Sequence, residues 1–223
     1  MERKVIITKD GSSSIYLPEW DEHYHSIHGA IQEAYHVFIK NGLTLLENRG
    51  QIKLLEMGFG TGLNAFITLI EGERKKMDID YTGLEAFPVS LEQVKQLNYV
   101  NLLKAKSREN DFIKMHEGNW EEKLMISELF HLTKRQQKFE SFSEKNSYDL
   151  IYYDAFGARV QPELWTENVF KKMFEALKEG GILVTYAAKG SVRRAMLTSG
   201  FDVEKLPGPP GKREMLRAIK PRK

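Results

Sequence analysis

The chain has 223 residues, which is enough for one domain with a full hydrophobic core. Its 33 Lys and Arg residues nearly balance 31 Asp and Glu residues, so the net charge of +2 neither requires nor excludes a nucleic-acid partner. The absence of Cys excludes disulfides, thiolate zinc sites and cysteine nucleophiles. No apolar run has signal-peptide character or approaches the roughly 20 residues that span a membrane. We therefore expect a cytoplasmic protein without a membrane partner.

Residues 1–50 predict a β-hairpin followed by a helix, as an N-terminal extension. Residues 4–8 and 14–17 flank the turn-rich KDGSS segment. Between positions 27 and 39, apolar residues recur at helical spacing, and Asn41 with Gly42 supplies a helix stop.

From residue 52 onward, strand-like and helix-like segments alternate, which is typical of parallel βαβ units. Only the short PGPPGK segment joins the last two strands, so we expect them to pair antiparallel. The pattern predicts a single α/β domain over residues 1–223, with a mostly parallel seven-stranded sheet and helices on both faces. The predicted strands are residues 52–57, 79–84, 112–116, 148–153, 181–187, 201–206 and 214–219, and the predicted helices are residues 64–70, 91–103, 165–177 and 190–198.

Residues 120–147 interrupt this alternation as a charged insertion. The segment combines KLMISELFHL, whose pattern predicts a helix, with the polar KRQQKFESFSEKNS. Two interpretations remain open: a solvated insertion, or a surface that helps a large substrate to dock.

Three glycines at alternate positions follow the first core strand, in the segment EMGFGTGLN. Ligands of doubly wound sheets bind beyond the carboxyl ends of the strands, and glycine lets the backbone approach a ligand closely. Gly58, Gly60 and Gly62 do not match the dinucleotide fingerprint G-x-G-x-x-G, because Leu63 stands at its third glycine position. A tight turn without a ligand is the alternative.

With Glu56 leading, this segment resembles motif I of class I S-adenosyl-L-methionine-dependent methyltransferases. The resemblance implies their Rossmann-like fold and a loop that surrounds the methionine end of the donor, with Glu56 on the ammonium side. The donor-binding residues that it implies here are Glu56, Gly58, Phe59, Gly60, Thr61, Gly62 and Asn64.

Two further strand ends point to the same ligand. Glu85 follows the strand at residues 79–84, where a carboxylate can accept hydrogen bonds from both ribose hydroxyls. The strand predicted at residues 112–116 is followed by Asn119, at a position where related enzymes carry an acidic residue, and its amide can still bind adenine. Trp120 either stacks on adenine or belongs to the core.

The fourth predicted strand carries Asp154 at its carboxyl end, where we expect the chemistry. A carboxylate there can orient an amine nucleophile and accept its proton, directly or by relay to water. Methyl transfer is an in-line displacement at a sulfonium, so alignment of amine, methyl carbon and sulfur lowers the barrier.

Four motifs in a fixed order, EMGFGTGLN, DAFGARVQPELWT, KGSVRRAMLTSGF and GKREML, resemble the bacterial tRNA 5-aminomethyl-2-thiouridine methyltransferases. The match extends from about residue 10 to residue 219, and it is the joint order that is specific. It implies that 5-aminomethyl-(2-thio)uridine at the tRNA wobble position becomes the 5-methylaminomethyl form, with S-adenosyl-L-homocysteine as the donor product. In the best-known members this part is fused to a flavin-dependent oxidoreductase. The chain resembles the methyltransferase part alone, so no flavin is expected.

The resemblance also implies contacts with tRNA. The segment DEHYHSIHGA looks like the family's N-terminal active-site segment, in which Tyr24 and His25 either cover the donor and exclude water or serve the fold alone. Its histidines lack a carboxylate set that would complete a metal site, so we expect no metal. Because tRNA needs a local basic face, Lys189 and Arg213 are the preferred cations, and Phe156 is a candidate platform for an extruded uridine.

Other enzyme classes share parts of this pattern. Aminopropyltransferases use the same scaffold but hold polyamines with several carboxylates, whereas Asp154 stands alone in its motif. A methyl- or aminopropyltransferase acting on a small-molecule amine is the alternative function. A non-catalytic RNA-binding module would instead bind tRNA without affinity for the donor.

Overall fold

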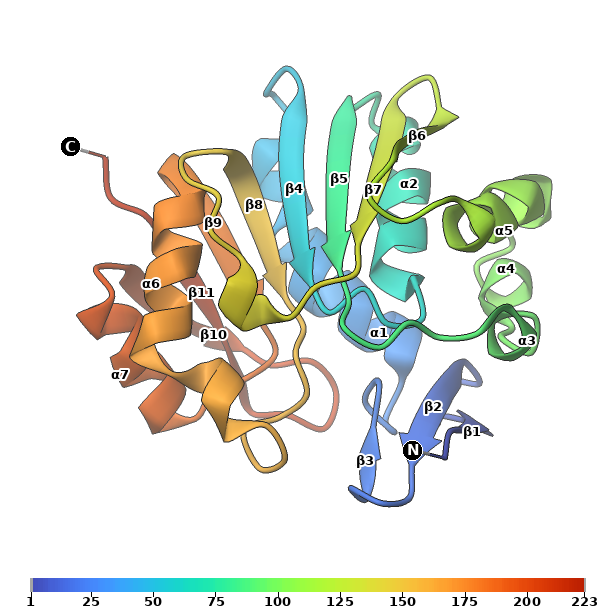
Figure 1. Cartoon of the computed structure of the whole chain (residues 1–223), viewed down its shortest axis with the longest axis horizontal. Coiled ribbons are helices and arrows are strands. Elements are labelled where there is room, and N and C mark those ends of the chain that lie inside the picture. Colours follow the sequence, from blue (N-terminus) through green and yellow to red (C-terminus); the bar gives the residue numbers. More distant parts are fainter. Residues whose placement is uncertain (1, 223) are drawn as a thin grey trace.

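A mostly parallel sheet of eight strands forms the centre of the fold in the computed structural model, which describes residues 2–222 (Figure 1). Its strands are β4 (Ile52–Met57), β5 (Ile79–Leu84), β6 (Lys123–Ser127), β7 (Phe130–Arg135), β8 (Tyr148–Tyr153), β9 (Leu177–Thr185), β10 (Asp202–Pro207) and β11 (Glu214–Ile219). The order across the sheet is β10-β11-β9-β8-β4-β5-β7-β6. The strands from β9 to β7 run parallel, whereas β6, β10 and β11 each pair antiparallel with a neighbour. The predicted α/β class is confirmed, with one strand more than expected.

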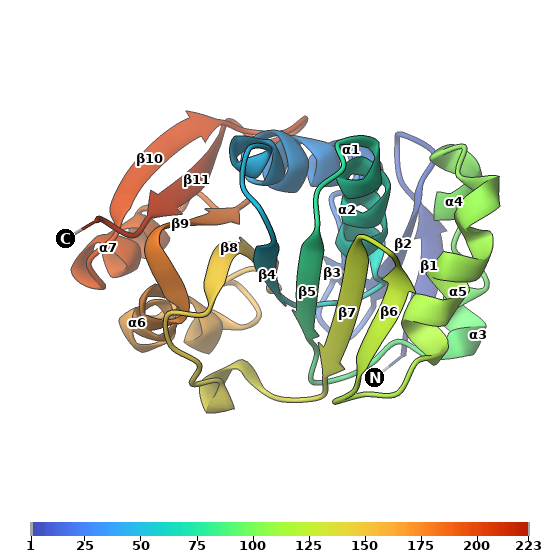
Figure 2. The ribbon, with the colours of Figure 1, turned by 90° about the horizontal axis from the view of Figure 1, so that it is seen from above.

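Helices cover both faces of this sheet (Figure 2). The helices are α1 (Ala30–Ala34), which continues as a π-helix (Tyr35–Lys40), α2 (Leu63–Arg74), α3 (Leu91–Val94), α4 (Tyr99–Leu102), α5 (Glu109–Glu117), α6 (Glu167–Ala176) and α7 (Gly190–Thr198). Short 3-10 turns occupy Leu43–Leu46, Lys106–Arg108, Phe139–Ser141 and Pro162–Trp165. The elements α1, α2, α4 and α5 contribute to the core on one face, and α6 and α7 to the core on the other.

Two hydrophobic clusters, one on each face of the sheet, hold these layers together. Neighbouring residues of β4 belong to different clusters, because successive side chains of a strand point to opposite faces. Leu54 joins the cluster that contains Phe66 of α2, and Leu55 joins the cluster that contains Phe170 of α6. Burial on both faces fixes the carboxyl end of β4, from which the glycine loop starts.

The predicted N-terminal hairpin is confirmed and gains a third strand. Its sheet lies beyond the carboxyl ends of the parallel strands (Figure 1). Asn98 ties it to the main body, since its amide donates to the Gly11 carbonyl at 2.9 Å and accepts from the Ser13 N–H at 2.8 Å. The three strands are β1 (Lys4–Ile7), β2 (Ser13–Leu17) and β3 (Glu22–His23).

The strand predicted at residues 112–116 is wrong, because these residues lie in helix α5. Phe112 and Met115 are its buried residues, three positions apart, and Glu109 and Asp111 place negative charge in its first turn. A window of five residues is too short to distinguish a period of 2 from a period of 3.6.

The third strand along the chain comes instead from the segment 120–147, whose KLMISELFHL stretch the pattern predicts as a helix. That stretch forms β6 and the start of β7, in which Phe130, Leu132 and Lys134 alternate as buried residues. In the loop that follows, Phe139 and Phe142 are buried. The part of the segment that forms β6 and β7 therefore belongs to the sheet and is not an insertion, and the docking interpretation stays a prediction.

Other predicted element boundaries lie closer to the observed ones. The strands at 52–57, 79–84, 148–153 and 214–219 and the helix at 190–198 have the predicted bounds. The helix expected at 91–103 is divided into α3 and α4, and the one expected at 165–177 begins only at Glu167. Within residues 2–222, no helix has the length and apolar character needed to cross a membrane.

Candidate active site

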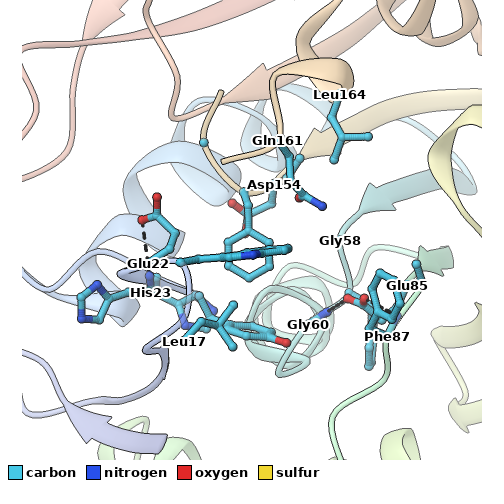
Figure 3. A pocket seen from close by; sticks show the side chains of 18 of the residues that line it. Leu17, Glu22, His23, Gly58, Gly60, Glu85, Phe87, Asp154, Gln161 and Leu164 are labelled. Carbon is cyan, nitrogen blue, oxygen red and sulfur yellow. Dashed lines mark hydrogen bonds between the residues drawn. The ribbon is translucent and has the colours of Figure 1, made fainter. Parts of the chain in front are cut away.

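A cavity of about 1300 Å³ lies at the carboxyl ends of the parallel strands (Figure 3). Its wall combines the N-terminal segment, the glycine loop after β4, and the segments that follow β5, β7, β8 and β9. Figure 3 shows Gly60 beside Glu85, with Asp154 on another part of the wall near Gln161. This is the place where doubly wound sheets bind their ligands.

The glycine loop passes through a narrow space that side chains would fill. Gly58, Gly60 and Gly62 have φ angles of +100°, +52° and +71°, in the left-handed region. A Cβ atom on Gly58 would lie 2.6 Å from the Asp154 carbonyl oxygen, and one on Gly60 would lie 3.2 Å from the Tyr24 ring. The bare backbone therefore allows the loop to run between the end of β8 and the N-terminal segment.

Thr61 anchors the loop from behind. Its hydroxyl accepts a hydrogen bond from the Tyr99 hydroxyl at 3.1 Å and lies 3.3 Å from His25 Nε2, while its carbonyl lies 3.1 Å from His116 Nε2. Thr61 is only 1% exposed, and neither it nor Gly62 lines the cavity. These two predicted donor-binding residues thus shape the loop, whereas Gly58, Phe59, Gly60 and Asn64 line the cavity.

Asn64 links the two carboxylates that the sequence singles out. Its Nδ2 amide donates to Glu56 Oε1 and to Asp154 Oδ2, both at 2.8 Å. Glu56 is fully buried and also accepts from the Tyr81 hydroxyl at 2.7 Å. Burial raises the pKa of Glu56 well above its usual value, against these two hydrogen bonds, which lower it. Because Glu56 lies behind Asn64 and outside the cavity wall, its direct effect is to orient the Asn64 amide.

Asp154 is the carboxylate that faces the cavity. Burial, together with the negative charge of Glu33, raises its pKa from 3.8 to about 7. The hydrogen bond from Asn64 and the positive charge of Lys212 act in the opposite direction. A carboxyl group that titrates near neutral pH is suited to accepting a proton during a reaction.

Glu85 occupies the predicted position at the end of β5. Its Oε2 accepts the Gly60 N–H at 3.0 Å, and its Oε1 accepts the Phe87 N–H at 2.9 Å (Figure 3). These two hydrogen bonds hold the carboxylate at the edge of the glycine loop, where it lines the cavity.

Asn119 does not occupy the predicted adenine position, because the strand expected before it is helix α5. Its side chain is exposed, donates to Glu122 Oε2 at 3.0 Å and lies outside the cavity. Trp120 also lies outside the cavity wall, where it packs edge-on against Phe59 at 6.5 Å and beneath the Lys134 ammonium. Trp120 is half-buried and belongs to neither hydrophobic cluster, so a core position is not supported, and stacking on adenine stays a prediction.

The segment after β7 forms the part of the cavity wall that was expected from Asn119 and Trp120. Lys138, Phe139 and Glu140 line the cavity beyond the true third parallel strand. Their role does not follow from the sequence alone, because they belong to the segment whose composition predicts a charged insertion. The alternation of Phe130, Leu132 and Lys134 is the signal that could have found them.

Three aromatic side chains cover the side of the cavity next to Asp154. Tyr24 and Trp20 both pack edge-on against Phe156, with centroid distances of 5.0 and 5.6 Å. Burial raises the pKa of Tyr24 to about 12, so its hydroxyl stays neutral at physiological pH. All three residues line the cavity, so Tyr24 and Phe156, two predicted substrate-binding residues, lie on the same part of its wall.

His25, in the N-terminal segment, is held by side chains of the protein itself. Both ring nitrogens of His25 contact side-chain oxygens, Nδ1 that of Ser14 and Nε2 that of Thr61. Burial lowers the pKa of His25 to about 4, so the ring carries no charge at neutral pH. Among residues 2–222, no group of three His, Cys, Asp or Glu side chains is arranged to hold a metal ion.

Of the two preferred cations, Lys189 lines the cavity and Arg213 does not. Arg213 is exposed beside its neighbour Lys212, which does line the cavity and forms an ion pair with Glu33. Glu33 is a cavity residue that the sequence analysis missed entirely, since it lies in a helix with no distinctive motif around it.

Comparison with known proteins decides the family. Residues 90–221 match the model of a family described as S-adenosyl-L-methionine-dependent methyltransferase, which covers more than half of the chain. The chain belongs to this methyltransferase family. The glycine loop lies outside the matched residues, so the loop and the family match are independent observations.

Curated relatives of this methyltransferase carry the name tRNA 5-methylaminomethyl-2-thiouridine biosynthesis bifunctional protein MnmC. The protein from Cupriavidus metallidurans is 29% identical over 228 residues, which cover 94% of this chain and 33% of the relative. The protein from Leptospira interrogans is 29% identical over 211 residues, which cover 89% and 32%. The chain thus spans about a third of the length of the curated relatives that it matches.

Solved structures support the fold. MNMC2 from Aquifex aeolicus superposes with a TM-score of 0.74 at 26% identity, over 97% of this chain and 70% of that chain. Spermidine synthase from Thermotoga maritima superposes with a TM-score of 0.55 at 12% identity, over 97% of this chain and 71% of that chain, and this likeness concerns the fold alone.

The residues at the cavity fit the donor that the family uses. Asn64 Oδ1 is buried without a hydrogen-bond partner in the described part of the chain, so it can accept from the ammonium group of the methionine end. The glycine loop leaves room for close backbone approach, and Glu85 can serve the ribose hydroxyls. These residues of the methyltransferase would hold S-adenosyl-L-methionine, which supplies an electrophilic methyl group when bound.

Replacing Gly58 by Ala should disrupt this cradle. The new Cβ meets the Asp154 carbonyl at a φ angle that strains any other residue, at a cost of about 1–3 kcal/mol. We expect donor binding, measured by calorimetry, to weaken roughly tenfold or more. Gly50→Ala is the matched control, because nothing lies within 4 Å of its Cβ position. Wild-type affinity in Gly58→Ala would contradict this account of the loop.

Asp154→Asn should stabilise the methyltransferase in a pH-dependent way. The pKa of Asp154 is about 7 in the folded state, raised from 3.8, so ionisation of Asp154 destabilises the folded state. The resulting loss in the free energy of unfolding is absent below about pH 4 and complete above about pH 7. Removing the charge should therefore raise the free energy of unfolding at pH 8 by about 4 kcal/mol. The gain should shrink steadily between pH 7 and pH 5 in denaturant titrations. The exposed Asp202→Asn is the control, and an equal gain at all pH values would contradict the assignment.

Proposed function

We propose that the chain transfers a methyl group from S-adenosyl-L-methionine to the amino nitrogen of 5-aminomethyl-(2-thio)uridine at the wobble position of tRNA. The names of the relatives support this substrate, because they describe biosynthesis of the methylaminomethyl product. The observation that carries the proposal is Asp154, a carboxylate of raised pKa that lies beside the glycine loop in a cavity able to hold both donor and acceptor. The product nucleoside would be 5-methylaminomethyl-(2-thio)uridine, with S-adenosyl-L-homocysteine released.

The acceptor amine must lose a proton before it can react. An alkylamine is protonated at neutral pH, as a lysine side chain is. Ionised Asp154 accepts one proton from this ammonium group and leaves a lone pair on the nitrogen. The nitrogen then forms a bond to the methyl carbon as the bond from that carbon to sulfur breaks, and the new secondary amine carries the positive charge. Asn64 holds Asp154 in place, and Tyr24 with Phe156 excludes water from this side of the cavity.

Exposed cations near the cavity are available to tRNA phosphates. Lys138 and Lys189 are exposed on different parts of the wall and have no ion-pair partner in the described chain, and exposed Arg213 lies nearby. Phe87 is 63% exposed at the cavity and can stack on a nucleobase. Such a substrate implies a cytoplasmic protein, and phosphate contacts imply affinity that falls steeply with salt.

A small-molecule amine is the second candidate acceptor. The sequence analysis counts Asp154 alone, but Glu22 and Glu33 also line the cavity, as a polyamine site would require. Each of the two is paired with a cation, Glu22 with Arg159 and Glu33 with Lys212. The pairing of Glu22 with Arg159 removes one of the negative charges that a polyamine would need, which favours an acceptor with a single amine.

Transfer of labelled methyl from the donor to tRNA tests the proposal. The tRNA comes from cells that lack this modification, and digestion to nucleosides locates the label. We expect label in 5-methylaminomethyl-(2-thio)uridine with the wild type, and a loss of at least about a hundredfold in Asp154→Ala because general-base assistance is removed. Asp202→Asn should match the wild type. No labelled nucleoside, with donor binding confirmed, would reject tRNA and direct the search to small amines.

The pH dependence of a single turnover tests the part of Asp154. Because the carboxylate must be ionised to accept the proton, the rate should fall about tenfold per pH unit below about pH 7. In Asp154→Asn the residual rate should lose this transition and follow only the ionisation of the amine itself. An unchanged profile in the variant would show that another group accepts the proton.

A further inference from the structure

The cavity contains a binding site for an alkylammonium group, and Lys212 occupies it. The Lys212 ammonium lies 2.5 Å from Glu33 Oε2 and 3.8 Å from the centroid of the Tyr186 ring. A carboxylate and an aromatic face are the two partners that best hold such a cation. All three residues line the same cavity as Asp154.

The two walls of this site are fixed without Lys212. Glu33 Oε1 accepts the Ser26 N–H at 3.2 Å, and the Tyr186 hydroxyl donates to the Ala155 carbonyl at 2.8 Å. Glu33 lies in helix α1 and Tyr186 directly follows β9, so each belongs to a packed part of the fold. The carboxylate and the ring can therefore keep their positions when the cation is exchanged.

The Lys212 side chain, by contrast, can move from this site into solvent. Lys212 lies in the segment that joins β10 and β11, and its side chain is 30% exposed, whereas that of Glu33 is 9% exposed. Withdrawal into solvent costs little for the lysine, because an ammonium is well hydrated in water. It would cost much for Glu33 to remain there alone, since an unpaired buried charge is strongly unfavourable.

We infer that Glu33 and Tyr186 bind the protonated amino group of the acceptor, in the place that Lys212 occupies in this structure. The inference rests on the proposed function, which supplies an acceptor with one primary amine. That group, a CH₂ carrying NH₃⁺, is chemically the same as the end of a lysine side chain. The Tyr186 hydroxyl donates a hydrogen bond to the carbonyl of Ala155, the residue after Asp154. The bound ammonium therefore lies close to the carboxylate that takes its proton.

The surrounding charges are arranged to favour this exchange. The negative charges of Glu22 and Asp154 also act on Tyr186, whose pKa they raise, and Arg159 pairs with Glu22. When Lys212 leaves and the acceptor ammonium arrives, the net charge of the cluster does not change. The acceptor thus replaces one positive charge by another, and no carboxylate in the cavity loses its counter-charge.

Two shape-preserving variants separate this inference from a structural salt bridge. Glu33→Gln removes the carboxylate that would hold the acceptor, whereas Lys212→Met removes only the competing ammonium. If the pair merely ties its loop to α1, breaking it from either side should have the same effect. If the site binds the acceptor, the two variants should differ.

The measurement is the ratio of affinities for two tRNAs at pH 7, one carrying 5-aminomethyl-2-thiouridine and the other 2-thiouridine at the wobble position. S-adenosyl-L-homocysteine is present so that no methyl transfer occurs. We expect the wild type to prefer the aminomethyl tRNA roughly tenfold, as a charge-assisted contact allows. Glu33→Gln should lower this ratio to about one, and Lys212→Met should keep or increase it.

Arg213→Met is the control for lost positive charge on the same loop. Because Arg213 lies outside the cavity, its replacement should weaken both tRNAs alike and leave the ratio unchanged. Thermal unfolding of each variant confirms that it is folded. A ratio that falls equally in Glu33→Gln and Lys212→Met, or that survives in Glu33→Gln, would overturn the inference. Failure of the proposed function would look different, since the wild type itself would then transfer no methyl to the aminomethyl tRNA.

Discussion

The active site depends on one amide group that donates to two carboxylates. Asn64, in the first turn of α2, joins Glu56 at the end of β4 to Asp154 after β8. Without it, two buried acidic groups would face each other with nothing between them, and each would raise the pKa of the other. The oxygen of the same side chain is buried without a hydrogen-bond partner in the described part of the chain. In the function that we propose, donor binding and proton acceptance are therefore coupled through this single residue.

The N-terminal segment is as much a part of the site as the sheet is. His25 contacts the back of the glycine loop through Thr61, Tyr24 packs on Gly60, and Glu33 sets the charge opposite Asp154. The sheet alone would hold a donor in an open cleft. The N-terminal segment closes the side of the cavity next to Asp154, which explains why aromatic and acidic residues are concentrated in a stretch that adds only three short strands to the fold.

Elements with a strong local sequence pattern could be predicted, and elements with a weak or ambiguous pattern could not. β4, β5 and β8 are continuous apolar segments followed by recognisable motifs, and their bounds and functional ends were predicted. The elements predicted for residues 112–135 are wrong, because an amphipathic helix and a hairpin both show short apolar alternation. As a consequence of this error, the predicted adenine contact fell on Asn119. Glu33 and Lys212 could not be paired from sequence, since they lie 179 positions apart and only the closed fold brings them together.

The pairing of charges also accounts for how a nearly neutral chain would serve the polyanionic substrate that we propose. Inside the cavity, Arg159 and Lys212 are paired with acidic partners, so they set the local chemistry and do not attract phosphate. At its edge, Lys138 and Lys189 have no such partners in the described chain, so they are available to the phosphates of the substrate that we propose. Net charge therefore says little about this protein, because paired charges inside the cavity and exposed cations at its rim meet separate requirements. In the function that we propose, the interior exchanges one ammonium for another, while the rim holds an anion in place.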